Sequence, residues 1–326
     1  MRIDRRLLGW GLFFIVLGSV PLAVQAGLID QDVVARWPSL WPFLLVGWGL
    51  GLLLRRTPVE WLGGGIAAVT LGLMAGGALA AGFGNVPGMT ACNTNSPGTA
   101  FATQSGTFAG SGQLNVEFNC GSLTVGTVDG SGWSLEGTER NGRTPAVTTS
   151  GSTVKLESPP GDNIFNSSGS ANWNVSVPKA PSLGLGVTLN AGEGSLDLAG
   201  ANLASTSMTL NAGTIVLDLG ASQSLGDVNA TVNAGKASVG LPGGSRTANV
   251  SLNAGDVSVC VPTGTAMRVT WNGALGSNNL DAAGLTKLDD HTWVSPGFDT
   301  NQPHLELHVS ANAGSFHLLF GGGCNA

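Results

Sequence analysis

The fold of this chain is decided by the stretch VTLNAGEGSLDL at residues 187–198, which is followed by MTLNAGTIVLDL at residues 208–219. Both segments are centred on the tripeptide Asn-Ala-Gly, and hydrophobic residues alternate with polar or small ones on either side of it. A hydrophobic period of two is typical of β-strands, so each segment is predicted to form a strand, a tight turn and a second strand. Asn and Gly suit such a turn because both enter left-handed backbone conformations at low cost.

The tripeptide recurs five times, with first steps of 21, 22 and 20 residues and a last gap of 59 that is close to three more steps. An earlier, degenerate copy has the sequence VEFNCGSLTV at residues 116–125. One such unit cannot bury its apolar side alone, whereas stacked units can. The sequence therefore predicts an all-β domain that is a β-solenoid, or β-helix, with rungs of roughly 21 residues.

The Asn and Gly of each turn are interpreted as structural residues. Stacked asparagines form ladders of side-chain amides that satisfy buried turn groups, and this explains them better than ligand binding does. The predicted turn residues are Asn119, Gly121, Asn190, Gly192, Asn211, Gly213, Asn233, Gly235, Asn253, Gly255, Asn312 and Gly314.

The composition argues against several classes of function. The chain has 326 residues, 51 of them Gly, and only 10% are charged, against about 25% in an average soluble protein. Residues 1–84 carry a net charge of +2 and the remainder −8, which together give the formal net charge of −6. Without a basic stripe, a nucleic-acid partner is not expected. The common catalytic and phosphate-binding motifs are missing as well, so the sequence predicts no enzyme and no cofactor.

Three apolar stretches fill the N-terminal quarter: Leu7–Leu28, Trp37–Leu54 and Trp61–Phe83. Each is close to the ~20 residues that a helix needs to cross a bilayer. The first could also be a signal peptide cleaved near residues 23–26, but two more apolar stretches follow at once and favour a retained helix. Residues 1–84 are therefore predicted to form a module of three transmembrane helices.

Arginines set the orientation that we expect for this module. Arg2, Arg5 and Arg6 precede the first stretch, and Arg55 and Arg56 follow the second. By the positive-inside rule, the N-terminus is then cytoplasmic and the C-terminal part lies outside. Gly72 and Gly76 in the third stretch form a small-xxx-small pair, which we expect to serve helix packing within the chain.

The rest of the chain divides by composition. Residues 85–112 are rich in Gly, Ser, Thr, Asn and Pro and are predicted to be a linker or an irregular first coil. Residues 113–326 form the predicted extracytoplasmic β-solenoid domain. Two or three rungs without the tripeptide are expected between Thr263 and Pro303, and Phe316–Phe320 with Cys324 are expected to cap the end.

All four cysteines lie in the part predicted to be outside: Cys92, Cys120, Cys260 and Cys324. An oxidising compartment would allow two disulfides, for which three pairings exist. Cys260 occupies an outward offset of its repeat, which favours a bond to Cys324 in the tail and leaves Cys92 for Cys120.

One group of residues could bind a metal. His304, Glu306 and His308 alternate with two leucines, so on a strand all three would lie on its outer face. Two imidazoles and a carboxylate can bind zinc or another divalent cation, but no fourth ligand is evident. A solvated polar strand face is the preferred interpretation, and these residues remain weak metal candidates.

The residues of the second apolar stretch carry a family resemblance. The sequence WPSLWPFLLVGWGLGLLL at residues 37–54 resembles the membrane segment of LiaF/LiaI-like bacterial proteins. The repeat domain resembles the adhesin-like "toastrack" β-helix domains that often follow such segments. The resemblance implies a place in the bacterial plasma (inner) membrane and an association with cell-envelope stress sensing, near a two-component histidine kinase. It offers no catalytic residues.

These observations lead to three functional hypotheses. The first is a non-enzymatic accessory protein or sensor of envelope stress, whose helices contact the lipid bilayer and whose solenoid binds a partner protein, such as a histidine kinase, or an envelope polymer. The second is a structural or adhesive surface protein that uses the solenoid as a stalk. The third, and weakest, is a metal-dependent hydrolase that uses His304, Glu306 and His308.

Overall fold

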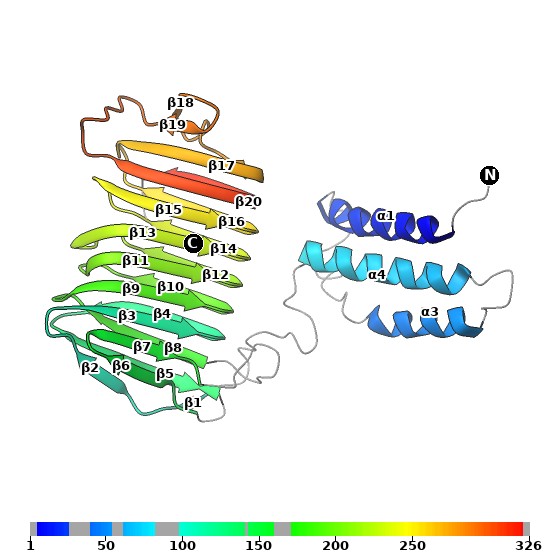
Figure 1. Ribbon diagram of the computed structural model, residues 1–326, viewed down its shortest axis with the longest axis horizontal. Coiled ribbons are helices and arrows are strands. Elements are labelled where there is room, and N and C mark those ends of the chain that lie inside the picture. The colour runs from blue at the N-terminus through cyan, green and yellow to red at the C-terminus, as the bar shows by residue number, and fades with distance from the viewer. Residues whose placement is uncertain are drawn as a thin grey trace. The chain divides into compact units, whose positions relative to one another are not determined.

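The computed structural model describes residues 5–25, 40–53, 61–81, 98–140, 143–159 and 171–321. The chain divides into two units, Met1–Ala91 and Cys92–Ala326, and each has its own structure. Figure 1 draws the helices of the first unit in blue and cyan, and the strands of the second unit from blue-green to red.

The first unit contains the helices α1 (Arg5–Gln25), α3 (Trp41–Leu53) and α4 (Trp61–Ala81), and α4 packs against both of the others. Gly72 and Gly76 lie where α4 meets α1. A Cβ atom at Gly72 would come within 2.9 Å of the Phe13 carbonyl oxygen, and one at Gly76 within 2.8 Å of the Leu17 carbonyl oxygen. The small-xxx-small pair therefore lets two helices of the same chain approach closely.

The prediction of three transmembrane helices is wrong. Among the described residues, no helix combines the length and the apolar character that a membrane crossing requires. With 13 residues, α3 is about 20 Å long, against a hydrocarbon core of about 30 Å. In α4, twelve of the 21 residues are Gly or Ala, whose small side chains offer little apolar surface. The same finding contradicts the predicted multi-pass location in the plasma membrane, with a cytoplasmic N-terminus and an extracytoplasmic domain.

The described residues of the second unit form twenty strands, most of which Figure 1 shows as stacked arrows. Their bounds are β1 (Thr99–Ala100), β2 (Gln104–Thr107), β3 (Ser111–Phe118), β4 (Gly121–Val128), β5 (Gly132–Glu139), β6 (Ala146–Ser150), β7 (Thr153–Glu157), β8 (Ala171–Pro178), β9 (Ser182–Leu189), β10 (Gly192–Asp197), β11 (Asn202–Leu210), β12 (Gly213–Asp218), β13 (Ser224–Val232), β14 (Gly235–Gly240), β15 (Arg246–Leu252), β16 (Gly255–Val261), β17 (Met267–Asn278), β18 (Thr286–Lys287), β19 (Thr292–Val294) and β20 (Leu305–Phe320). β1 and β2 fall within the stretch for which a linker or an irregular first coil is predicted.

Two parallel ladders run along the stack. The first ladder has the order β7, β3, β9, β11, β13, β15, β20 and β17. The second has the order β8, β4, β10, β12, β14, β16, β20 and β17, because β20 and β17 continue through the corner into both. The tripeptide forms the corner between the two strands of a rung. This arrangement is consistent with the β-solenoid part of the predicted fold.

The core lies between the two ladders. In β9 the residues Leu183, Leu185, Val187 and Leu189 are buried, and the neighbouring rungs repeat this pattern. Each fully buried Leu or Val stabilises the fold by about 1.5–3 kcal/mol through the hydrophobic effect. Strand alternation turns the remaining side chains outward, so the sequence pattern fixes both the core and the outer faces.

The rungs do not follow chain order at either end of the solenoid. β20 lies between the β15–β16 rung and β17, so Asn253 and Asn312 are on adjacent rungs. The prediction of two or three rungs between Thr263 and Pro303 is therefore wrong. That segment contains β17 and an excursion with the short strands β18 and β19, which pair antiparallel to each other. The cap is formed by this excursion and not by Phe316–Phe320; Trp293 in the excursion and Trp271 on β17 are both buried.

Candidate functional site

The outer face of the first ladder is a regular surface. Next to the corner it carries one hydroxyl per rung, in a row that we call the hydroxyl row: Thr188, Thr209, Thr231, Ser251 and Ser310. A second row lies two residues earlier on each strand and contains Gly186, Ser207, Asn229, Asn249 and His308. Successive rungs are about 4.8 Å apart and alternate residues of a strand about 6.7 Å apart, so the two rows form a flat grid.

The grid carries no carboxylate, ammonium or guanidinium group. In the hydroxyl row the three threonines are half-buried by their neighbours and the two serines are exposed. In the second row Ser207, Asn229 and His308 are exposed, and Asn249 donates a hydrogen bond of 3.0 Å to the Asn229 side chain. The surface therefore offers hydrogen-bond donors and acceptors without a field that would select a charged ligand.

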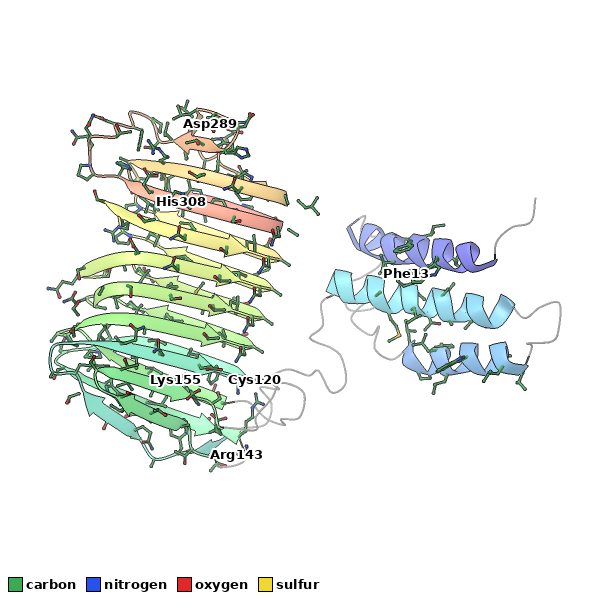
Figure 2. All side chains as sticks on the ribbon, in the orientation of Figure 1. Phe13, Cys120, Arg143, Lys155, Asp289 and His308 are labelled. Atoms are coloured by element: carbon green, nitrogen blue, oxygen red, sulfur yellow. The ribbon has the colours of Figure 1, made fainter. Side chains whose placement is uncertain are left out.

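Charged side chains are paired at the two ends of the grid, and Asp227 on β13 lies exposed beside its middle. Lys155 contacts Glu117 at 3.4 Å and also pairs with Glu157. The hydrogen bond to Glu157, with a smaller contribution from Glu117, raises the pKa of Lys155. Figure 2 labels Lys155 towards one end of the strand stack and His308 towards the other.

At the other end, Glu306 accepts from Arg268 at 3.2 Å and contacts His304 Nε2 at 2.9 Å. His304 Nδ1 lies 2.7 Å from the Gln302 carbonyl oxygen, and the Phe298 ring packs edge-on against the imidazole. Both ring nitrogens thus face acceptors, which favours the charged imidazolium. The Gln302 carbonyl, followed by the Glu306 carboxylate, raises the pKa of His304.

This geometry bears on the weak metal candidates. Glu306 and His308 lie on the outer side of β20 and His304 directly precedes it, but His304 and Glu306 are engaged with each other and with Gln302 and Arg268. The described part of the chain contains no group of three or more His, Cys, Asp and Glu side chains that could hold a metal ion. His317 lies beyond the corner on the second ladder, where it pairs with Ser258.

A continuous ladder of six asparagine amides borders the hydroxyl row. Each Nδ2 donates to the Oδ1 of the preceding rung, at distances of 2.8, 2.6, 2.6, 2.6 and 2.7 Å. In order, the ladder contains Asn119, Asn190, Asn211, Asn233, Asn253 and Asn312. Because these amides bond one another, the ladder fixes the corner of each rung and leaves ligand contacts to the neighbouring rows.

The glycine that ends each tripeptide is required for two reasons. Gly213 has φ of +115°, a left-handed conformation that favours glycine. A Cβ atom there would also overlap the carbonyl oxygen of Gly192 on the adjacent rung. The equivalent residues Gly121, Gly192, Gly235, Gly255 and Gly314 have φ between +114° and +134°.

Two of the four cysteines lie among the described residues. Cys120 and Cys260 are both disulfide-bonded, and the described residues include no free cysteine. The predicted partners Cys92 and Cys324 lie outside the described residues, so the pairing stays a prediction.

A buried polar cluster near Cys120 has no signal in the sequence pattern. Glu139 and Arg140 are 2% and 3% exposed. The Glu139 carboxylate accepts from Trp173 Nε1 at 2.8 Å and from the Arg140 backbone N–H at 3.0 Å. Arg140 donates to the Cys120 carbonyl oxygen at 3.0 Å. Because the cluster is enclosed, it ties β5 and β8 to the β3–β4 corner and is not open to a ligand.

Residues 103–242 match the family model described as the N-terminal domain of toast_rack, DUF2154. This match supports a toastrack β-helix domain in the second unit, whereas the likeness to LiaF/LiaI proteins stays a prediction. No curated protein matches the chain.

Two solved structures are similar to the second unit. One is a candidate cell adhesion protein from Clostridium sporogenes, with 16% identity, a TM-score of 0.44, and coverage of 67% of this chain and 99% of that one. The other is a candidate adhesin from Bacteroides fragilis, with 10% identity, a TM-score of 0.28, and coverage of 67% and 96%.

Proposed function

We propose that the β-solenoid is a non-enzymatic binding module that holds an extended, uncharged polysaccharide against the grid on its first ladder. The observation that carries this proposal is the regular grid of hydroxyl and amide side chains, whose two rows contain no carboxylate, ammonium or guanidinium group. A hydroxyl group both donates and accepts hydrogen bonds, as the hydroxyl groups of a sugar do. The match to a toastrack domain supports the β-helix that presents this grid, and such a module would serve adhesion to a surface polymer.

The affinity is expected to depend on the length of the polymer. One hydrogen bond made in place of water contributes about 0.5–1.5 kcal/mol, so a short oligosaccharide binds weakly. The grid contains no Phe, Tyr or Trp, so stacking on sugar rings does not add to the binding. A polymer that spans several rungs makes many such bonds at once, and its later contacts form at a high effective concentration.

A single rung offers a matched pair of variants for the test. Thr209 lies in the hydroxyl row on β11, and Thr214 lies on the outer side of β12, across the corner of the same rung. The full chain and its T209E and T214E variants would be titrated with neutral glucans of graded length and with anionic alginate. We expect glucan affinity to rise with length and T209E to weaken it by about tenfold or more, since an unpaired carboxylate must be desolvated at the interface.

T214E should bind glucans as the unchanged chain does. No glucan binding at any length, equal losses in the two variants, or preference for alginate would each refute the proposed face.

A more specific version of this proposal is the sensing of envelope stress. In it, polymer binding at the grid changes the activity of a partner protein such as a histidine kinase. Deleting the gene distinguishes the two uses. A changed response to cell-wall antibiotics would support sensing, whereas altered attachment with an intact response would support adhesion.

A further inference from the structure

The far end of the solenoid leaves part of a strand edge open. β19 pairs antiparallel with the outer edge of β17 over residues 268–270, and the Trp271 N–H donates to the His291 carbonyl oxygen at 2.8 Å. From residue 272 to residue 278 only β20 pairs with β17, on its inner side. Among the described residues, none makes a backbone hydrogen bond to the outer side of this segment, which we call the open edge.

The open edge lacks the features by which proteins usually protect strand edges. Its sequence NGALGSN contains no Pro, Lys or other charged residue. Five of its seven residues are exposed, and Leu275 is 86% exposed, more than any other large hydrophobic residue among those described. At the opposite end of the solenoid, β5 and β6 pair antiparallel with β8 and β7 and cover those strands.

We propose that two copies of this chain associate by antiparallel pairing of their open edges, with a two-fold axis at Leu275. A row of free backbone N–H and C=O groups is satisfied best by another strand, and the pairing with β19 shows that this edge accepts an antiparallel neighbour.

The sequence of the open edge is compatible with pairing to itself. With the axis at Leu275, Asn272 faces Asn278, Gly273 faces Ser277 and Ala274 faces Gly276. No like charges meet, which would destabilise directly opposed residues, and the small side chains leave room for the two Leu275 side chains to contact each other. A two-fold axis places the same patch on both copies, as in most homodimers.

The association is weak by itself because seven residues per copy bury far less than the ~1,200 Å² typical of stable interfaces. Its effect on a polymeric ligand would nevertheless be large. A dimer presents two grids, and engagement of one raises the effective concentration of the other. The pairing rests on the open edge alone and holds whether or not the ligand is a polysaccharide.

A cysteine placed on the axis tests the register directly. Opposite residues of an antiparallel pair have Cα atoms about 4.5–5.5 Å apart, which suits a disulfide. In the full chain, Leu275→Cys should therefore give a covalent dimer under mild oxidation. Ser277→Cys is the matched control, because its two copies would lie four residues apart along the strands, about 13 Å.

Sedimentation of the full chain up to about 1 mM measures the association itself. We expect a reversible dimer, and we expect Leu275→Lys to weaken it by about tenfold or more, because two ammonium groups would then face each other. Equal cross-linking at positions 275 and 277 would refute the register. A chain that stays monomeric throughout, or a dimer that Leu275→Lys leaves unchanged, would refute the pairing.

Discussion

Replacing Asn211 with Ala tests whether the amide ladder stabilises the solenoid. Asn211 lies inside the ladder, where its Nδ2 donates to the Asn190 Oδ1 at 2.6 Å and its Oδ1 accepts from the Asn233 Nδ2 at 2.6 Å. Asn312 lies at its end. It donates to the Asn253 Oδ1 at 2.7 Å, and the residue beside it on β17 is Ala274, which has no amide.

The expected loss of stability follows from the number of hydrogen bonds that each substitution removes. Each hydrogen bond contributes about 0.5–1.5 kcal/mol net. Asn211→Ala removes two bonds between half-buried groups and is expected to cost about 1–3 kcal/mol. Asn312→Ala removes one bond at an exposed position and is expected to cost about half as much. For a domain of this size, 1 kcal/mol lowers the melting temperature by about 2–4 °C.

Urea and thermal unfolding, followed by the far-ultraviolet circular dichroism of the strands, measure both losses in the full chain. The expected result is a larger loss for Asn211→Ala than for Asn312→Ala, in a ratio near two. If both variants lost the same stability, or if Asn211→Ala matched the unchanged chain to within about 0.3 kcal/mol, the ladder would not carry the stabilisation assigned to it.

Two further predictions concern the corners and the end of the grid. Gly213→Ala should destabilise the chain by several kcal/mol in urea unfolding, because its Cβ would overlap the adjacent rung. The control is Gly130→Ala, which is also at positive φ but has open space around its Cβ and should cost only about 1–2 kcal/mol. Similar costs for the two variants would refute the role of contact between rungs. His304 has a pKa raised by the Gln302 carbonyl and by Glu306, so its contribution to stability is complete below its unfolded value, near 6.5, and is lost as pH rises through the folded pKa. His304→Gln should remove that pH dependence of the urea midpoint, and an unchanged profile would contradict it.

The repeat was sufficient to predict the local structure of the solenoid. The offsets around Asn190 and Asn211 put Val187 and Met208 inward and Thr188 and Thr209 outward, and the structure pairs these residues in that register. This works because strand alternation and the fixed position of the corner are local properties. The grid is a consequence of the same alternation.

The order of the rungs and the nature of the helices were not predictable in the same way. A gap of 59 residues between Asn253 and Asn312 fits three rungs as well as one displaced strand and an excursion, because spacing does not show which strands pair. The contact of Glu139 with Trp173 joins residues that are 34 apart and follows no repeat. In the first unit, hydropathy over an apolar stretch overestimated the length of α3, which ends at Leu53 after 13 residues.

The strands that lie out of chain order protect the edges at the two ends of the solenoid. β3 and β20 are the first and last long strands in chain order, yet each has a parallel neighbour on both sides, so neither is an edge. The outermost strands β7, β8 and β17 instead pair antiparallel with β6, β5 and β19. Covering an edge in this way removes the free backbone groups that would recruit other chains. Among the described residues, this cover is missing from β17 beyond Trp271, where an antiparallel strand of a second copy would supply it.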